Sequence, residues 1–326
     1  MSENFALANV MRTADMLIRN NLSVKPGEQV LIIADYVTDF IVVNAIASAC
    51  TVVGAEPTIT VMPPRAFNGA PPTRIVEQAA IGADVIISPA STPMTYSKFR
   101  WELTNAKKTR FCTMPGINAD QMTHGASQAD YNKVERTTKR LAEIYRGKTV
   151  RVTSEFGCDI TAGIEGVLPM VVAGFAREKG LTCCFPDGET PIIPPNPGTA
   201  EGILVWDTSA HTLKMLIEPL KMSVKKGKVV EVFDSKDAPR FKKILEDVGD
   251  EGRYITEFSI GTNPMARITG NVSEDKKGIG RVHIAVGTYG VSGKDAAVHI
   301  DGVIQKPTVE VDGKIIVEKG ALKIDL

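Results

Sequence analysis

Apolar strand-like runs alternate with helix-like segments through the first half of this chain, and this alternation restricts its fold more than any other feature of the sequence. The run Q-V-L-I-I-A-D (29–35) is continuously apolar, as in a strand buried on both faces. Similar runs follow at 57–62, 83–88 and 110–114. The helices expected between and after the strands cover 2–20, 39–54, 73–82 and 131–147. Because a parallel connection needs room for a helix, residues 1–148 are expected to form an open, parallel-sheet α/β domain.

The second half of the chain has a different pattern. From T-V-R-V-T-S (149–154) onward, short alternating runs are separated by glycine-rich turns, and helical spacing is confined to 165–179 and 236–248. Five prolines fall between residues 185 and 198. Because proline has no backbone N–H to donate and fixes its φ angle, this stretch is expected to be a stiff surface loop rather than a helix or central strand. Residues 149–326 are therefore expected to form a mixed α+β domain with an antiparallel component.

Two histidines and an aspartate stand in strand-like runs near the C-terminus. His299 and Asp301 are two residues apart, so both side chains point to one face of a strand, about 6.6–6.8 Å apart along its axis. His283 lies in the preceding run, and the glycines between the runs permit a turn that brings it alongside. Imidazole with carboxylate suits zinc, cobalt, iron or manganese. The three residues therefore predict a metal site in the second domain; the alternatives are an ion pair or a solvent-facing strand.

Composition and motifs exclude several other classes of function. The 38 basic and 38 acidic residues cancel, so no broad field would recruit nucleic acid or an anionic membrane. The N-terminus lacks a signal-like pattern and no run approaches the ~20 apolar residues of a membrane span, which indicates a cytoplasmic protein. The sequence has no nucleotide-binding glycine fingerprint, no G-x-S-x-G motif and no C-x-x-C pair. We therefore expect neither a nucleotide cofactor nor covalent catalysis.

Four short motifs, taken in their order along the chain, resemble a known enzyme family. They are F-P-D-G-E (185–189), T-E-F-S-I-G-T-N-P (256–264), V-H-I-A-V-G-T-Y (282–289) and V-H-I-D (298–301). Together they are similar to the thermophilic aminopeptidases of the aminopeptidase T type, which are metallopeptidases with two co-catalytic divalent ions. Any one motif alone would be weak evidence, so the resemblance rests on their order.

The resemblance implies a set of six metal ligands. They are Glu189, Glu257, His283, Tyr289, His299 and Asp301. It also implies that Glu257 bridges the ions or acts as general base, and that Tyr289 is a ligand or donates to the tetrahedral oxyanion. Without the resemblance, Glu189 would be interpreted as a charge on a surface loop and Glu257 as a solvent-facing strand residue. His124 and His211 are interpreted as ordinary core or surface histidines.

A related branch, similar to the 2,5-dihydroxypyridine ring-cleaving dioxygenases, holds one iron(II) with two histidines and an aspartate. Its last two ligands fall on His299 and Asp301, whereas its first histidine falls on Glu257. Because two carboxylates and two histidines suit a two-metal site better than this iron site, the leading expectation is a hydrolase that cleaves an amide bond with a metal-activated water. The alternatives are an iron(II) dioxygenase and a non-catalytic relative that binds a small ligand.

The aminopeptidase resemblance also implies a cofactor and partners. We expect two divalent ions of zinc, cobalt or manganese about 3.5–4 Å apart, with a short peptide or another small molecule as substrate. The family is commonly dimeric, so a homodimer is expected. Neither nucleic acid nor a membrane is expected as a partner.

Overall fold

A computed structural model describes residues 3–66, 69–95, 97–106, 108–288 and 298–324. The contacts between Cα atoms divide the chain into two compact units. The first comprises Met1–Tyr131 and Gly174–Asp187, and the second comprises Asn132–Ala173 and Gly188–Leu326. The units interleave along the sequence because the segment 174–187 returns to the first unit. The boundary between two domains at residues 148 and 149, expected from the sequence, stays a prediction.

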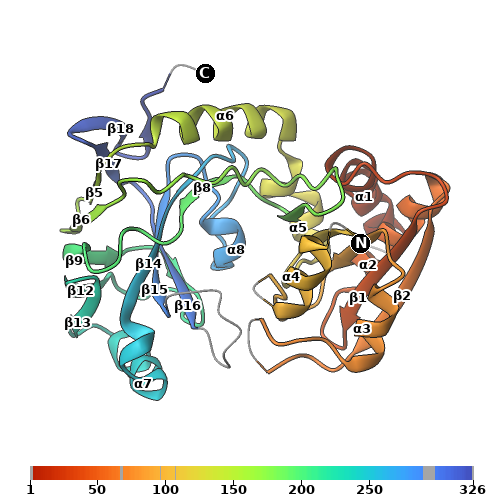
Figure 1. The fold of residues 1–326 in the computed structure, drawn as a ribbon, viewed down its shortest axis with the longest axis horizontal. Coiled ribbons are helices and arrows are strands. Elements are labelled where there is room, and N and C mark those ends of the chain that lie inside the picture. The colour runs from red at the N-terminus through yellow and green to blue at the C-terminus, as the bar shows by residue number, and fades with distance from the viewer. Residues whose placement is uncertain (1–2, 67–68, 96, 107, 289–297, 325–326) are drawn as a thin grey trace. The chain divides into compact units, whose positions relative to one another are not determined.

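A parallel sheet forms the first unit, as the alternation of strands and helices predicts. Its strands are β1 (Gln29–Asp35), β2 (Glu56–Met62), β3 (Val85–Ser88), β4 (Arg110–Thr113) and β7 (Thr182–Cys184), in the order β2-β1-β3-β4-β7. Its helices are α1 (Glu3–Met16), α2 (Phe40–Val52), α3 (Arg74–Ala80), α4 (Lys98–Asn105) and α5 (Ala119–Thr123), with a π-helical turn at Leu17–Asn21 and a 3₁₀ turn at Gly125–Gln128. All neighbouring strands pair in parallel. The predicted α/β architecture of this part is confirmed (Figure 1).

The continuous apolar runs explain the centre of this sheet. Every residue of β1 after Gln29 is buried, and so are all residues of β3 and β4. Such burial is expected of strands covered on both faces. At the end of β1 the chain turns directly into α2, whose first turn is capped by the Asp39 side chain accepting a hydrogen bond from the Ile41 amide.

Antiparallel strands form a large curled sheet in the second unit. Its strands are β5 (Thr149–Thr153), β6 (Asp159–Gly163), β8 (Glu189–Ile192), β9 (Glu201–Trp206), β10 (Ser209–Ala210), β11 (Lys214–Met215), β12 (Leu220–Lys225), β13 (Lys228–Val232), β14 (Tyr254–Gly261), β15 (Val282–Gly287), β16 (His299–Ile304), β17 (Thr308–Val311), β18 (Lys314–Glu318) and β19 (Ala321–Leu322). They follow the order β11-β10-β16-β15-β14-β13-β12-β9-β6-β5-β17-β18-β19, and β8 pairs with β14 beside this path. The predicted antiparallel component is confirmed.

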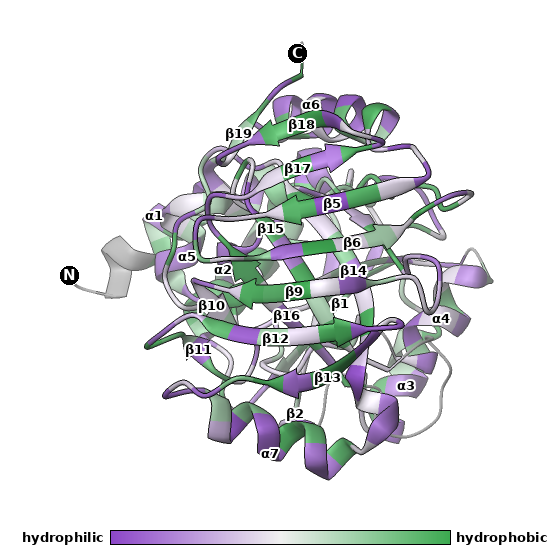
Figure 2. Ribbon diagram, turned by 90° about the vertical axis from the view of Figure 1, so that its left-hand side faces the viewer, coloured by the Kyte–Doolittle hydropathy of each residue, from purple (hydrophilic) through white to green (hydrophobic). Residues whose placement is uncertain are grey.

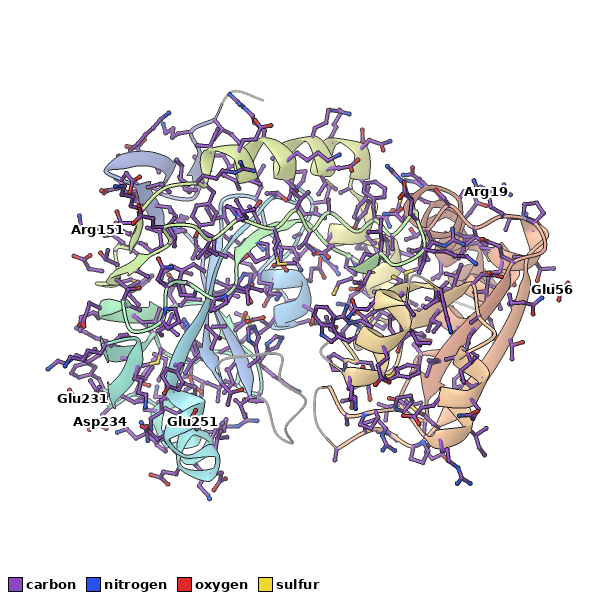
Figure 3. All side chains as sticks on the ribbon, in the orientation of Figure 1. Arg19, Glu56, Arg151, Glu231, Asp234 and Glu251 are labelled. Carbon is purple, nitrogen blue, oxygen red and sulfur yellow. The ribbon has the colours of Figure 1, made fainter. Side chains whose placement is uncertain are left out.

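In the part of the chain that the structure describes, three helices accompany this sheet. They are α6 (Tyr131–Ile144), α7 (Ala238–Val248) and α8 (Val272–Asp275), with a 3₁₀ turn at Asp250–Arg253. Figure 2 shows β17, β5, β6, β9, β12 and β13 side by side, with α6 at one end of the row and α7 at the other. In Figure 3 the charged side chains of Arg151 and Glu231 extend outward from β5 and β13. Within the described residues, none of the helices is both long enough and apolar enough to span a membrane.

Two sequence predictions in the second half are wrong. In the described chain no helix forms at 165–179, which instead contains turns, bends and an isolated antiparallel bridge between Val172 and Glu189. Pro169 keeps the preceding residue out of the helical region, and Gly166 and Gly174 have φ angles of 79° and 74°, which a right-handed helix does not contain. The proline-rich stretch 185–198 is more than a surface loop, since it contains β8, all of whose residues are buried.

The pairing of β8 explains how a strand accommodates proline. Pro191 lies opposite Ser259 of β14, while its carbonyl accepts a hydrogen bond from the Met170 amide on the other side. Glu189 exchanges two backbone hydrogen bonds with Val172 on that same side. The backbone groups of Glu189 and Pro191 therefore face away from β14, and the missing proline donor removes no bond from the β8–β14 ladder.

Gly302 of β16 lets the largest buried side chain pack against the sheet. The fully buried Trp206 indole donates a hydrogen bond to the Ile284 carbonyl at 3.1 Å and meets the Phe241 ring of α7 edge-on, with the ring centroids 5.2 Å apart. A Cβ atom at Gly302 would lie 1.8 Å from the indole. Only glycine fits here, so the position of β16 depends on this residue.

Replacing Gly302 with alanine should therefore lower the free energy of unfolding by about 1–3 kcal/mol, because the indole is both buried and hydrogen-bonded and has no room to move. Urea denaturation measures the change. Gly82→Ala is the matched control, since its Cβ would meet nothing closer than the Ala79 carbonyl at 4.0 Å. Equal stability of the two variants would contradict the packing explanation.

Candidate metal centre

Three neighbouring strands bring four of the predicted residues to one face of the sheet. Glu257 of β14 lies opposite Ala285 of β15, which in turn lies opposite Asp301 of β16. His283 and His299 are each two residues from a member of this row and therefore share its face. Ala285 has only a methyl side chain, so the larger side chains around it have room to converge.

A β-bulge in β14 sets the direction of Glu257. The pairing with β15 shifts between Ile255 and Glu257, which leaves Thr256 as an extra residue. In a regular ladder Thr256 would fall opposite Ala285, and the glutamate would point to the other face of the sheet. The bulge thus turns the carboxylate toward the histidines, and it places Thr256 Oγ1 3.4 Å from His299 Nδ1.

Glu257 lies at the centre of the cluster. Its Oε1 lies 2.9 Å from His283 Nε2, and its Oε2 lies 2.9 Å from His299 Nε2. His299 Nε2 lies equally close to Asp301 Oδ1, at 2.9 Å. Glu257 is 1% exposed, so it is not the solvent-facing strand residue that its local sequence alone would suggest.

Glu189 reaches the same cluster from β8. It lies opposite Gly261 of β14, is 6% exposed, and has its Oε2 3.6 Å from His283 Nε2. The interpretation of this residue as a surface charge is therefore wrong. Five of the six predicted residues come together, whereas the sixth, Tyr289, lies outside the described residues.

Two lysines and a third histidine also contact the cluster, and none of the three was predicted from the sequence as a site residue. Lys276 Nζ lies 2.7 Å from Asp301 Oδ2, and Lys277 Nζ lies 2.5 Å from Glu189 Oε1. His211 Nδ1 lies 3.5 Å from Asp301 Oδ2, and burial lowers the pKa of this histidine to about 4. The lysines follow α8 and the histidine follows β10, so no periodic pattern marks them.

Charge pairing governs the protonation of the cluster. Burial by itself would raise the pKa of Glu257, but the interactions with His283 and His299 outweigh it and lower the pKa. The pKa of Asp301 is likewise lowered, against the effect of burial, by Lys276 and His299. Burial by itself would lower the pKa of His299, but Asp301 and Glu257 raise it to about 10. At neutral pH the metal-free cluster thus holds ionised carboxylates and a protonated His299.

The cluster contains two groups of donor atoms suited to a metal ion. One consists of Glu189, Glu257 and His283, the other of Glu257, His299 and Asp301, and within each group the donor atoms lie within 4.8 Å of one another. Among the described residues, Glu189 Oε2 is buried without a hydrogen-bond partner, and Asp301 Oδ1 is a buried carboxylate oxygen that faces His299 Nε2 at 2.9 Å. Because such oxygens are costly to bury, the donor set fits a divalent cation, and imidazole with carboxylate suits a first-row transition metal.

Comparison with known proteins identifies the family. Residues 16–324 match the family model described as 2,5-dihydroxypyridine 5,6-dioxygenase. The chain belongs to this family. The solved structure of 2,5-dihydroxypyridine dioxygenase from Pseudomonas putida KT2440 is similar at a TM-score of 0.80 and 16% identity, over 97% of both chains. Wild-type AmpT from Thermus thermophilus is similar at a TM-score of 0.68 and 15% identity, over 97% of this chain and 99% of AmpT. No curated protein matches the chain.

These findings correct the expected class of enzyme. The expectation of an aminopeptidase-like metallo-hydrolase is wrong, because the family model that matches residues 16–324 is that of a dioxygenase. AmpT shows the shared fold alone at 15% identity. The resemblance makes His299 and Asp301 ligands in both the aminopeptidases and the dioxygenases, so the order of the motifs could not distinguish the two families. Membership of a dioxygenase family implies a metal, for which the cluster has suitable donors.

Binding of a divalent ion at this cluster should release about one proton at pH 7. His299 must be neutral to bind metal, whereas its pKa of about 10 keeps it protonated in the metal-free protein. Because this pKa lies above neutrality, release should be nearly complete at pH 7 and should decline as the pH approaches 10. Calorimetric titration with Mn²⁺ in buffers of different ionisation enthalpy measures the proton count. A binding heat that does not depend on the buffer would contradict the assignment.

Proposed function

We propose that this protein is an iron(II)-dependent dioxygenase that opens the ring of a hydroxylated pyridine. The observation that carries the proposal is the donor group of the buried Glu257 and Asp301 with the partly buried His299, in a chain of the 2,5-dihydroxypyridine 5,6-dioxygenase family. The family name describes the addition of both atoms of dioxygen across the C5–C6 bond. In such a reaction the ring is oxidised as that bond breaks and dioxygen is reduced, so no separate reductant is needed.

Glu257, His299 and Asp301 would hold the ion. Two ionised carboxylates balance the charge of a divalent cation, and the neutral imidazole of His299 adds a nitrogen donor that suits iron. When bound, iron(II) supplies the one-electron chemistry through which dioxygen reacts with an organic substrate. Three protein donors also agree with the general rule that catalytic metal sites retain positions for small molecules.

This donor set differs from the iron site that the resemblance implies. In that site a histidine would stand at the position of Glu257, so this protein would use one histidine and two carboxylates. The exchange adds a negative charge and an oxygen donor. Because carboxylate oxygens suit manganese, Mn²⁺ is the ion to compare with iron(II).

Two further residues hold the ligands in place. His283 Nε2 lies 2.9 Å from Glu257 Oε1, and Lys276 Nζ lies 2.7 Å from Asp301 Oδ2. Each contact engages one oxygen of a carboxylate and leaves the other directed toward His299. Partners of this kind fix ligand orientation and tune affinity. His283 and Lys276 are therefore proposed as positioning residues rather than ligands.

The proposed partner is a small hydroxylated N-heteroaromatic substrate, which replaces the expected peptide. The expected homodimer stays a prediction, as does the expectation that neither nucleic acid nor a membrane is a partner.

Oxygen uptake provides the test of this function. The protein loaded anaerobically with iron(II) should consume dioxygen when 2,5-dihydroxypyridine is added, and both atoms of ¹⁸O₂ should appear in the ring-opened product. Loss of a residue that only orients a metal ligand typically reduces activity by about 10- to 100-fold. Asp301→Asn changes a proposed ligand itself and should reduce the rate by more than this. The control is His124→Ala, because His124 is an exposed histidine whose ring contacts Asp120 and Thr123 at the surface, away from the cluster.

An iron-loaded, folded protein that binds the substrate without consuming oxygen would argue against a dioxygenase. Full activity of Asp301→Asn would argue against the assigned metal group.

A further inference from the structure

The second donor group of the cluster is already paired with lysine. Glu189, Glu257 and His283 lie close enough to share a metal ion, yet Lys277 Nζ contacts Glu189 Oε1 at 2.5 Å. Lys276 Nζ lies 3.9 Å from Glu189 Oε2. The Lys277 side chain is 3% exposed, and an ammonium group this deeply buried requires a paired charge.

Backbone packing fixes the segment that carries these lysines. A Cβ atom on Gly261 of β14 would lie 2.2 Å from the Gly278 carbonyl oxygen and 2.7 Å from the Lys277 carbonyl carbon. The Asn263 amide donates to the Lys277 carbonyl at 2.9 Å, and the Lys277 amide donates to the Glu274 carbonyl at 3.0 Å. Gly261 thus permits a close approach that holds the Lys277 backbone against β14, directly beside the position of Glu189 in the ladder.

The turn before the lysines is equally well fixed. The Asp275 carboxylate accepts hydrogen bonds from the backbone amides of Thr269 and Gly270 and from the Ser209 hydroxyl. The Arg281 guanidinium donates to the Asp275 carbonyl at 2.9 Å. The ammonium groups of both lysines are therefore presented from a rigid turn rather than from a mobile surface segment.

The charges explain what this arrangement does. Together the two ammonium groups carry the same charge as one divalent cation. Lys277 contacts Glu189 Oε1, and Lys276 contacts Asp301 Oδ2. A divalent ion bound between Glu189 and Glu257 would have to displace Lys277 from Glu189. It would also experience repulsion from both ammonium groups in a poorly solvated interior, where charge interactions are strong.

We infer that Lys276 and Lys277 take the place of a second metal ion, so that the cluster binds one ion only. Lys277 neutralises Glu189 and keeps the Glu189–Glu257–His283 group closed to metal. Lys276 holds Asp301 with Oδ1 toward the single ion at Glu257, His299 and Asp301. This inference rests on the proposed position of that ion, but not on the reaction the ion serves.

Metal stoichiometry tests the inference without reference to activity. The wild-type protein, dialysed against Mn²⁺ and analysed for metal and protein, should hold about one ion per chain, with the electron paramagnetic resonance spectrum of an isolated Mn²⁺. Lys277→Met removes the charge and keeps a side chain of similar length. It should raise the content to about two ions per chain, and magnetic coupling between them should appear in the spectrum.

Three further variants make the result specific. Lys277→Arg restores the charge and should return the content to about one ion. Lys236→Met is the matched surface control, since Lys236 pairs with Glu218 in solvent, and should also hold one ion. The double variant Lys277→Met with Glu189→Gln removes both charges of the buried pair, so no unpaired charge stays in the interior. It should therefore fold even if Lys277→Met alone does not fold, and it should hold one ion.

Two ions per chain in the wild-type protein would overturn the inference, as would a folded Lys277→Met protein that still holds one ion. These outcomes are separate from those for the proposed function. Failure to consume oxygen with one ion bound would reject the dioxygenase and leave the role of the lysines standing.

Discussion

The contact of one buried carboxylate with two imidazoles is the interaction on which the candidate metal centre depends. Glu257 divides its two oxygens between His283 and His299 at 2.9 Å each, in a position that is 1% exposed. A carboxylate without such partners would be unstable in this interior. The strands that supply the three residues must therefore be aligned in one register, and the bulge at Thr256 is the local feature that turns Glu257 to the correct face.

Charge balance links this centre to the surrounding fold. Glu189, Glu257 and Asp301 bring three carboxylates together in a buried space, and Lys276 and Lys277 come from a separate turn to offset them. Because charge interactions are strong where water is excluded, each partner constrains the others. The proline-containing strand β8 and the close approach at Gly261 belong to the same arrangement, since they place Glu189 and Lys277 side by side.

A shared fold does not by itself specify the reaction. The chain has similar architecture to both a dioxygenase and AmpT at 15–16% identity, so the structural comparisons establish the fold alone. The family match over residues 16–324 distinguishes the two classes. The expectation of a hydrolase, which the family match contradicts, came from the resemblance to aminopeptidases and from a donor set of two carboxylates and two histidines. The sequence did not show that Lys277 pairs with one of those carboxylates, Glu189.

The sequence by itself determined the features that depend on local periodicity. Continuous apolar runs predicted the parallel sheet of the first unit, and the two-residue spacing of His299 and Asp301 placed both side chains on one strand face. Only the tertiary structure decided the β8–β14 pairing, the bulge at Thr256 and the approach of the two lysines to the carboxylates. These features depend on contacts between distant segments, and no local pattern of residues encodes such contacts. The sequence could therefore propose the metal donors, whereas their surroundings and charge balance required the folded chain.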